Sequence, residues 1–341
     1  MLVHSAPIEW PLLVIDFSFR CQGELARLER FQEILLSILL SITMRNGMRR
    51  PVTEVECVLA VPALLGESPV WSHQEKVLYW VDIKQPAIHR FDPATGGCQT
   101  WPMPEEIGSL ALRESGGAVA ALRTGFATVD FCTNVVHKLS CLSLAKPDMR
   151  FNDGRCDRRG RFWAGTLHEN RLLGTASIYR LDAGDRCTRV INGLTVSNGL
   201  AWGPDNRTMY FADSWTRTIF HCDFDLDTGT PHNQRVFAEV PAGSGVPDGA
   251  TVDSEGYLWS ANFAGGCITR YAPDGSVDRV IPMPVPRPTS CAFGGKDFSI
   301  LYVTSASINL TDEQRLAAPL AGGLFAVDAG VKGLPEPRFA G

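Results

Sequence analysis

The sequence lacks the patterns that mark several common classes of protein. Basic and acidic residues are nearly balanced, 32 against 37 for a net charge of -5, and no run is rich in Lys or Arg, so nucleic acid is not an expected partner. The ten cysteines include no Cys-x-x-Cys pair, and the seven histidines include no His-x-His or His-Glu-x-x-His pair. Neither a disulfide framework nor a zinc site built on thiolates and imidazoles is therefore indicated.

Two further absences concern catalysis and location. The chain has no Gly-x-Ser-x-Gly motif, which disfavours covalent catalysis by a serine nucleophile. Its densest apolar part, residues 34–43, is shorter than the roughly 20 residues that a membrane span requires. Acidic residues precede this run and no Ala-x-Ala cleavage site follows it, so a signal peptide is disfavoured. We expect no membrane span and a cytoplasmic protein, with export the less favoured alternative.

A repeat occupies most of the chain. Six times, a small polar residue is followed by a hydrophobic strand, a Gly-containing turn and a second, aromatic-rich strand; these starts are Glu67, Ser109, Asn152, Asn198, Asp248 and Ser290. Subtracting neighbouring numbers gives spacings of 42, 43, 46, 50 and 42 residues. Units of that size with about four short strands are typical of β-propeller blades. The sequence therefore predicts an all-β fold, a six-bladed β-propeller, over residues 51–341.

Residues 1–50 do not belong to the repeat and are predicted to form a non-propeller N-terminal extension. Apolar residues at steps of three or four predict a short amphipathic helix within Glu24–Thr43. Met48 lies just before the first blade, and a chain starting there would keep a strand at Val55–Leu59 to close the last blade. We expect residues 1–47 to be dispensable.

Four of the six repeat starts carry oxygen ligands: Glu67, Asn152, Asn198 and Asp248. Because equivalent positions in successive blades converge on one axis, this pattern indicates a metal site. Two carboxylates with amide oxygens suit Ca²⁺, Mg²⁺ or Mn²⁺, and are also compatible with Zn²⁺ or Fe²⁺. Taken singly, Asn198-Gly199 and Asp248-Gly249 are also common turn dipeptides. Asp82, Asp213 and Asn262, at the ends of second strands, are expected to cap backbone groups or to line the channel.

Several motifs carry a family resemblance. They are Leu65–Trp71, Arg150–Gly154, Phe162–Thr166, Val196–Trp202, Tyr210–Ser214, Pro247–Gly249 and Gly333–Phe339. In this order and spacing they resemble the regucalcin/gluconolactonase family of sugar lactonases, from about residue 55 to the C-terminus. The resemblance implies a six-bladed propeller with one divalent cation near the top of its axis, hydrolysing the cyclic ester of an aldonic acid.

The resemblance also implies roles for the residues at the axis. Glu67, Asn198 and Asp248 match the metal ligands, and Asn152 lies beside them as a ligand or substrate contact. Such a cation would polarise the ring carbonyl and stabilise the oxyanion, while a carboxylate deprotonates water. The sequence itself does not show whether Glu67 or Asp248 is the general base. The resemblance assigns this role to Asp248.

The expected substrate-binding residues are Arg150, Asn152, Glu169 and Asn170. Arg150 matches a family contact with substrate hydroxyls. A Glu of the family pattern falls here on Asn170, with Glu169 adjacent, and this departure leaves the sugar open. Replacing Asn170 by Glu is expected to change the preference among lactones.

Two other classes of function fit the same fold. One is a non-enzymatic propeller that binds calcium or a protein partner through its loops, because a propeller fold alone does not fix function. The other is a different metal-dependent esterase or phosphoesterase. The favoured partner is a small-molecule sugar lactone, and the favoured assembly is a monomer or small homo-oligomer.

Overall fold

The computed structural model describes residues 54–341 except residues 145 and 147. The predicted N-terminal extension and its helix at Glu24–Thr43 lie outside the described residues. None of the helices in the described residues is long and apolar enough to cross a membrane.

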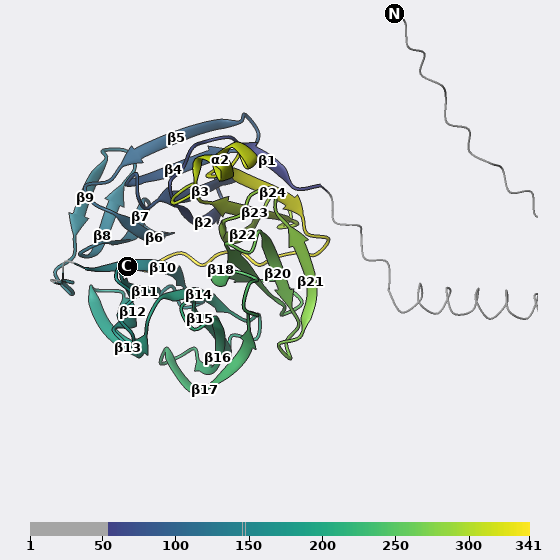
Figure 1. The fold of residues 1–341 in the computed structure, drawn as a ribbon. Coiled ribbons are helices and arrows are strands. Elements are labelled where there is room, and N and C mark those ends of the chain that lie inside the picture. Colours follow the sequence, from purple (N-terminus) through teal and green to yellow (C-terminus); the bar gives the residue numbers. More distant parts are fainter. Residues whose placement is uncertain (1–53, 145, 147) are drawn as a thin grey trace, which may run out of the picture. The chain divides into compact units, whose positions relative to one another are not determined.

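The described residues form six four-stranded antiparallel sheets arranged as blades around one axis (Figure 1). In the first three blades, from the innermost strand outwards, the strands are β2 (Gly66–Ser72), β3 (Val77–Asp82), β4 (Ala87–Asp92) and β5 (Gly97–Pro102); β6 (Ile107–Leu112), β7 (Ala118–Leu122), β8 (Gly125–Asp130) and β9 (Val135–Lys138); and β10 (Met149–Cys156), β11 (Phe162–His168), β12 (Ala176–Asp182) and β13 (Arg186–Leu194). In the last three they are β14 (Ser197–Trp202), β15 (Thr208–Asp213), β16 (Thr218–Asp225) and β17 (Thr230–Glu239); β18 (Val246–Val252), β19 (Leu258–Phe263), β20 (Cys267–Tyr271) and β21 (Val277–Pro282); and β22 (Pro288–Gly294), β23 (Ile300–Ser305), β24 (Leu324–Asp328) and β1 (Glu56–Leu59).

The predicted six-bladed propeller is confirmed. Every one of the six repeat starts lies in an innermost strand, as the convergence argument requires. The strand expected at Val55–Leu59 is β1, which pairs antiparallel with β24 and completes the sixth blade. The first and last strands of the propeller thus pair in the sixth blade, and this shared sheet closes the ring.

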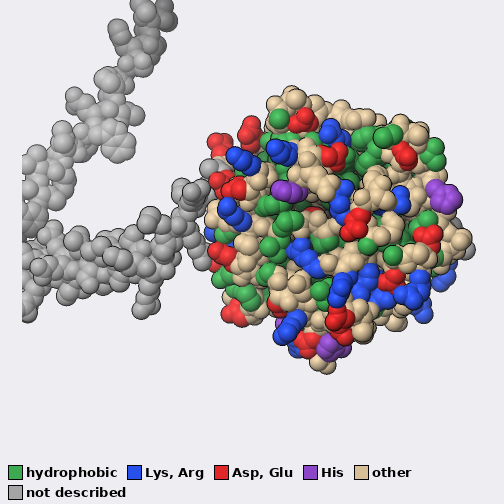
Figure 2. Space-filling model, turned by 180° about the vertical axis from the view of Figure 1, so that it is seen from behind, with side chains coloured by type: hydrophobic (Ala, Val, Ile, Leu, Met, Phe, Trp, Pro, Cys, Tyr) green, Lys and Arg blue, Asp and Glu red, His purple; other side chains and the backbone are tan. Residues whose placement is uncertain are grey.

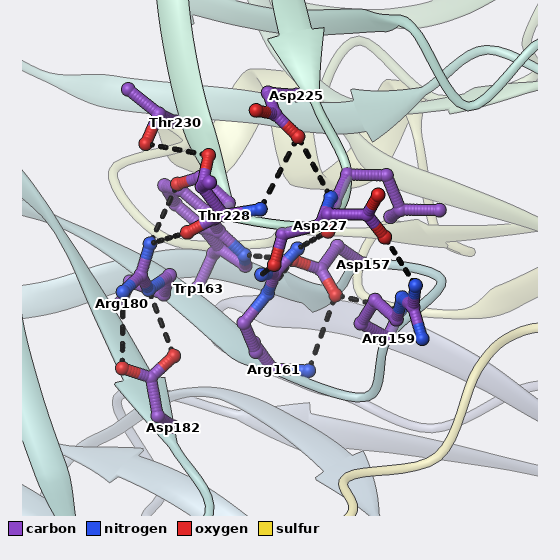
Figure 3. A network of polar contacts seen from close by, with 12 residues as sticks. Asp157, Arg159, Arg161, Trp163, Arg180, Asp182, Asp225, Asp227, Thr228 and Thr230 are labelled. Carbon is purple, nitrogen blue, oxygen red and sulfur yellow. Dashed lines mark hydrogen bonds and ion pairs between the residues drawn. The ribbon is translucent and has the colours of Figure 1, made fainter.

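Packing follows position within each blade. The innermost strands are almost wholly buried, whereas the outermost strands, such as β5 and β13, are largely exposed. Trp163 and Trp259 lie on second strands and are fully buried between blades. Their indole N–H groups donate to Asp157 at 2.8 Å and to Asp253 at 2.9 Å, so these two buried indoles keep a polar partner. Figure 3 shows that Asp157 also accepts a hydrogen bond from the Arg161 side chain.

Second-strand aspartates cap loops. Asp82 accepts hydrogen bonds from the backbone N–H groups of Leu64 and Leu65, and Asp213 from those of Thr195 and Val196. The capping role expected for these two aspartates is therefore confirmed. These bonds fix the segments that enter β2 and β14, the strands that carry Glu67 and Asn198. Asn262 shows no such cap among the described residues, since its buried Oδ1 has no hydrogen-bond partner and its amide nitrogen donates to Thr269 Oγ1 at 3.4 Å.

The C-terminal segment crosses the end of the axis at which the innermost strands finish. Figure 1 shows it running from the sixth blade across the centre of the ring. Gly333 forms a β-bridge with Asp253, Glu336 pairs with Arg155, and the backbone of Phe339 bonds to that of Leu112 at 2.8 Å. This segment, Gly333–Gly341, is called the C-terminal strap below. The candidate site residues lie toward the opposite end of the axis, where the innermost strands begin.

One described feature had no sequence-based expectation. The short helix α2 (Asp312–Ala317) is inserted between β23 and β24. Thr311 caps it, and Gln314 returns a hydrogen bond to the Thr311 backbone. This reciprocal pair satisfies two free N–H groups, which explains why so short a helix forms there.

Candidate active site

The four blades with oxygen-bearing starts share one irregularity. In β2, two residues lie opposite one residue of β3, between the pairs Glu67–Val81 and Val70–Tyr79. The same bulge occurs in β10 after Phe151, in β14 after Asn198 and in β18 after Pro247. A bulge re-aims side chains and bends its strand. The four candidate residues thus lie at or directly before a bulge: Asn152 and Asp248 are the first residues inside it, and Glu67 and Asn198 are the last paired residues before it.

The backbone conformation at these bulges explains why glycine follows Asn198 and Asp248. Gly199, after Asn198, has φ +64°, and Ser68, after Glu67, has φ +49°. A side chain at Gly249 would come within 2.0 Å of Ser290 on the next blade. Asn198-Gly199 and Asp248-Gly249 therefore lie inside strands β14 and β18 and not in hairpin turns. Glycine is needed there because a bulge, like a turn, requires a positive φ or a close approach to a neighbouring chain.

A cavity of about 760 Å³ opens at this end of the propeller. Glu67, Arg150, Asn152, Asn198 and Asp248 all line it, and each is buried to at least nine-tenths. Five of the predicted site residues, from four different blades, are thus brought to the inner end of one cavity.

A chain of hydrogen bonds orients the amides. Arg150 donates to the Asn152 amide oxygen at 2.8 Å, and the Asn152 amide nitrogen donates to Asn198 Oδ1 at 2.7 Å. The Asn198 nitrogen donates to Ser214 Oγ at 2.8 Å, and that hydroxyl donates to the Pro247 carbonyl at 2.6 Å. With its nitrogen so engaged, Asn198 presents its oxygen to the cavity, with one lone pair beyond the bond from Asn152.

The two carboxylates have few bonding partners. Among the described residues, each accepts a hydrogen bond only from the backbone N–H of the next residue, Ser68 for Glu67 and Gly249 for Asp248. Burial raises the pKa of Glu67, and the charges of Asp248 and Asp153 raise it further. Burial, followed by the charge of Asp153, raises the pKa of Asp248. Buried carboxylates of this kind are normally paired or bound to a metal.

The donor set fits a hard divalent cation. Within residues 54–341, no three His, Cys, Asp or Glu side chains are grouped so that they could hold a metal ion by themselves. Glu67 and Asp248 supply two carboxylates and Asn198 supplies an amide oxygen, all lining the same cavity. An oxygen-only set is what Ca²⁺, Mg²⁺ and Mn²⁺ prefer.

Arg150 lines the same cavity and donates to Asn152. Burial lowers the pKa of its guanidinium, against the opposing charges of Glu106 and Glu169. Its Nε atom is buried and has no hydrogen-bond partner among the described residues. A buried polar atom without a partner calls for an explanation, and a ligand group would supply one.

The predicted Glu169 lines the cavity but is engaged by cations. Lys84 binds it at 3.2 Å and Arg123 at 2.8 Å, and Glu106 joins the same two cations. The bond from Arg123 lowers the pKa of Glu169 to about 2. Asn170 is not among the cavity-lining residues; its backbone N–H donates to His168 Nδ1 at 3.2 Å.

Several residues around the cavity carry no expectation from the sequence. Asp153 is buried beside the carboxylates and accepts from Leu200 N–H at 2.8 Å; its place next to Asn152 in the repeat start is the one available signal. Ser214, which accepts from the Asn198 amide nitrogen, ends the motif Tyr210–Ser214 and had no predicted role at the site. Arg171 and Arg217 line the cavity from hairpin turns, where no motif marks them.

Comparison with known proteins gives consistent matches. A family model described as the SMP-30/gluconolactonase/LRE-like region matches residues 65–307. The chain is 42% identical over 288 residues to 6-deoxy-6-sulfogluconolactonase of Pseudomonas putida, covering 84% of this chain and 99% of the relative. It is 35% identical over 295 residues to regucalcin of Xenopus laevis, with the same coverage. The solved structure of a calcium-binding protein, regucalcin, from Agrobacterium tumefaciens is similar with TM-score 0.80 and 29% identity, covering 85% of this chain and 98% of that chain.

Proposed function

We propose, on the premise that the chain belongs to the SMP-30/gluconolactonase/LRE-like family, that it hydrolyses the ring ester of a sugar lactone to the aldonic acid with the help of one divalent cation. The family and the gluconolactonase-like hydrolase predicted from the sequence are both confirmed by these matches. The cation, the individual roles and the substrate are parts of the proposal.

The observation that carries the proposal is the pair of buried carboxylates at the inner end of the cavity. Glu67 and Asp248 have no side-chain cation bonded to them among the described residues, and Asn198 presents an oxygen beside them. These three residues would hold the cation. A bound cation would supply Lewis acidity at the ring carbonyl and stabilise the developing oxyanion.

Asp248 is assigned the role of general base. It accepts the proton of the attacking water, and its backbone partner, the Gly249 amide, leaves carboxylate lone pairs free for that bond. Glu67 remains a ligand. Its bond from Ser68 N–H, at 3.1 Å, keeps the carboxylate oriented.

Arg150 and Asn152 are assigned to the sugar. Both line the cavity, and the bond between them fixes each side chain. The amide nitrogen of Asn152 already donates to Ser197 O and Asn198 Oδ1, so a sugar hydroxyl would meet the unpartnered Arg150 Nε and the remaining lone pair of the Asn152 oxygen, both already in place. Glu169 and Asn170 remain proposed hydroxyl contacts. The cations that bind Glu169 leave it only part of its acceptor capacity.

Acid release from a panel of five- and six-carbon aldonolactones tests this function. Purified, cation-loaded protein is expected to hydrolyse at least one of them well above the spontaneous rate, and simple carboxylic and phosphate esters much more slowly. Esters hydrolysed faster than every lactone would favour the other esterase class. If nothing were hydrolysed, a binding propeller would be the better account.

A further inference from the structure

The outer part of the cavity is lined by two hairpin turns of neighbouring blades. The turn between β11 and β12 contributes Arg171, and the turn between β15 and β16 contributes Trp215 and Arg217. The Arg171 guanidinium lies over the Trp215 ring, with Cζ 5.2 Å from the ring centroid. Such a cation–π contact holds the guanidinium in place without using its N–H donors.

These two arginines differ from the other exposed cations at the cavity mouth. Across the part of the chain that the structure describes, neither guanidinium forms an ion pair or a hydrogen bond with another side chain. Lys84, which also lines the cavity, is bound to Glu106 at 2.6 Å and to Glu169 at 3.2 Å. The charge of Lys84 is therefore neutralised by carboxylates, whereas Arg171 and Arg217 keep free donors.

The charges of the cavity have a positive balance. Four cationic side chains line it (Lys84, Arg150, Arg171 and Arg217) against three acidic ones (Glu67, Glu169 and Asp248), a difference of 4 − 3 = +1. A divalent cation held by the two inner carboxylates would raise this to +3. On the face shown in Figure 2, Lys and Arg side chains are interspersed with Asp and Glu. The cavity thus favours an anionic ligand more than a neutral one.

We propose that Arg171 and Arg217 bind an anionic oxygen-rich group, a sulfonate or a phosphate, carried by the lactone at its end far from the ring carbonyl. This inference rests on the proposed function, which directs the ring carbonyl to the inner end of the cavity and so turns the other end of the sugar to the mouth. A guanidinium presents a planar fork of donors that matches tetrahedral oxyanions, and it stays charged at any physiological pH.

The test compares three lactones with the same ring: glucono-1,5-lactone, its 6-phosphate and its 6-deoxy-6-sulfonate. The measured quantity is kcat/KM for each anionic lactone divided by kcat/KM for the neutral one. The wild-type ratio should exceed about 10 for at least one anion, and each of Arg171→Met and Arg217→Met should lower it about tenfold, as expected for loss of a charge-assisted hydrogen bond. Arg171→Lys should give an intermediate ratio.

Arg207→Met is the matched control, because Arg207 is an exposed arginine in a hairpin turn that does not line the cavity. Its ratio should equal that of the wild type. The anion with the larger wild-type ratio identifies the group that is recognised. No preference for either anion, or an unchanged ratio in the double variant Arg171→Met/Arg217→Met, overturns the proposal while leaving lactone hydrolysis intact.

Calorimetry separates failure of this site from failure of the enzyme. The probes are gluconate and gluconate 6-phosphate, which require no turnover. Tighter binding of the phosphate that is lost in the double variant supports the anion site even if no lactone is hydrolysed. Equal binding of the two probes to the wild type overturns it.

Discussion

Replacing Asp248 by Asn tests the division of labour between the two buried carboxylates. The side chains are nearly equal in size, so no cavity opens, and the amide oxygen can still accept from Gly249 and still bind a cation. It cannot take a proton from water. Loss of a general base costs about 10²–10⁴-fold in turnover, so kcat at saturating cation should fall by that factor.

The same substitution has a consequence in cation-free protein. Asp248 is 6% exposed, and its charge lies near those of Glu67 and Asp153. Removing that charge should stabilise the cation-free fold by on the order of 1–3 kcal/mol, the cost typical of an uncompensated buried polar group. The melting temperature should rise by roughly 2–4 °C per kcal/mol.

The sign of the pH dependence follows from the direction of the shift. The raised pKa of Asp248 means that the folded state holds this proton more tightly than the unfolded state does. Cation-free wild type should therefore lose stability as pH rises above about 4, the usual value for Asp, until the pKa in the folded state is passed. The advantage of Asp248→Asn in melting temperature should widen over the same range.

Glu67→Gln is the matched comparison for catalysis. Its amide can still accept from Ser68, but it loses a charged ligand, so cation affinity should fall more than kcat at saturating cation. Equal residual kcat in the two variants at saturating cation would refute the assignment of the base. An Asp248→Asn protein no more stable than cation-free wild type at neutral pH would refute the electrostatic reasoning.

Three further predictions concern the parts around the site. Phe339→Ala in the C-terminal strap, where Phe339 is 1% exposed, should lower the free energy of unfolding by about 3–5 kcal/mol in urea titrations; a loss below about 1 kcal/mol would mean that the strap adds little. Glu169→Gln should cost about 0.5 kcal/mol at pH 7, a small effect because Glu169 is one-third exposed. Since the folded pKa of Glu169 is lowered to about 2, that difference should vanish as pH falls from about 4.5 to 2, and a pH-independent difference would contradict the ion-pair account. We also propose that a chain beginning at Met48 matches the full chain in melting temperature and lactonase rate; a substantial loss in either would show that the preceding residues contribute.

The arrangement of the blades was predictable because it depends on periodicity. Each start, from Glu67 to Ser290, opens a hydrophobic strand after an interval of 42 to 50 residues, and only an innermost strand places such residues on the axis. The same logic brought Glu67, Asn152, Asn198 and Asp248 together. The prediction of an aromatic-rich second strand is wrong for blade two, because β7 is Ala118–Leu122 and contains no aromatic residue.

The charged residues around the cavity could not be predicted in the same way, because their arrangement depends on contacts between turns of different blades. Glu169 is bound by Lys84, 85 residues away, and by Arg123, 46 residues away, and no local pattern links such positions. Arg171 and Arg217 occupy ordinary turn positions, and only the folded ring shows that both line one cavity. Asn198-Gly199 illustrates a local ambiguity, because its positive φ at Gly199 serves a bulge as well as a turn.

The most direct test of the account measures lactone turnover against cation occupancy. The protein is stripped with a chelator, single cations are added back, and acid release is followed while the bound cation is counted. Turnover should disappear on stripping and return in proportion to one cation per chain, and Glu67→Gln should shift that restoration to higher cation concentration. Full turnover in protein shown to be free of cation, or restoration unaffected by Glu67→Gln and Asp248→Asn, would contradict a cation-dependent lactonase site at these residues.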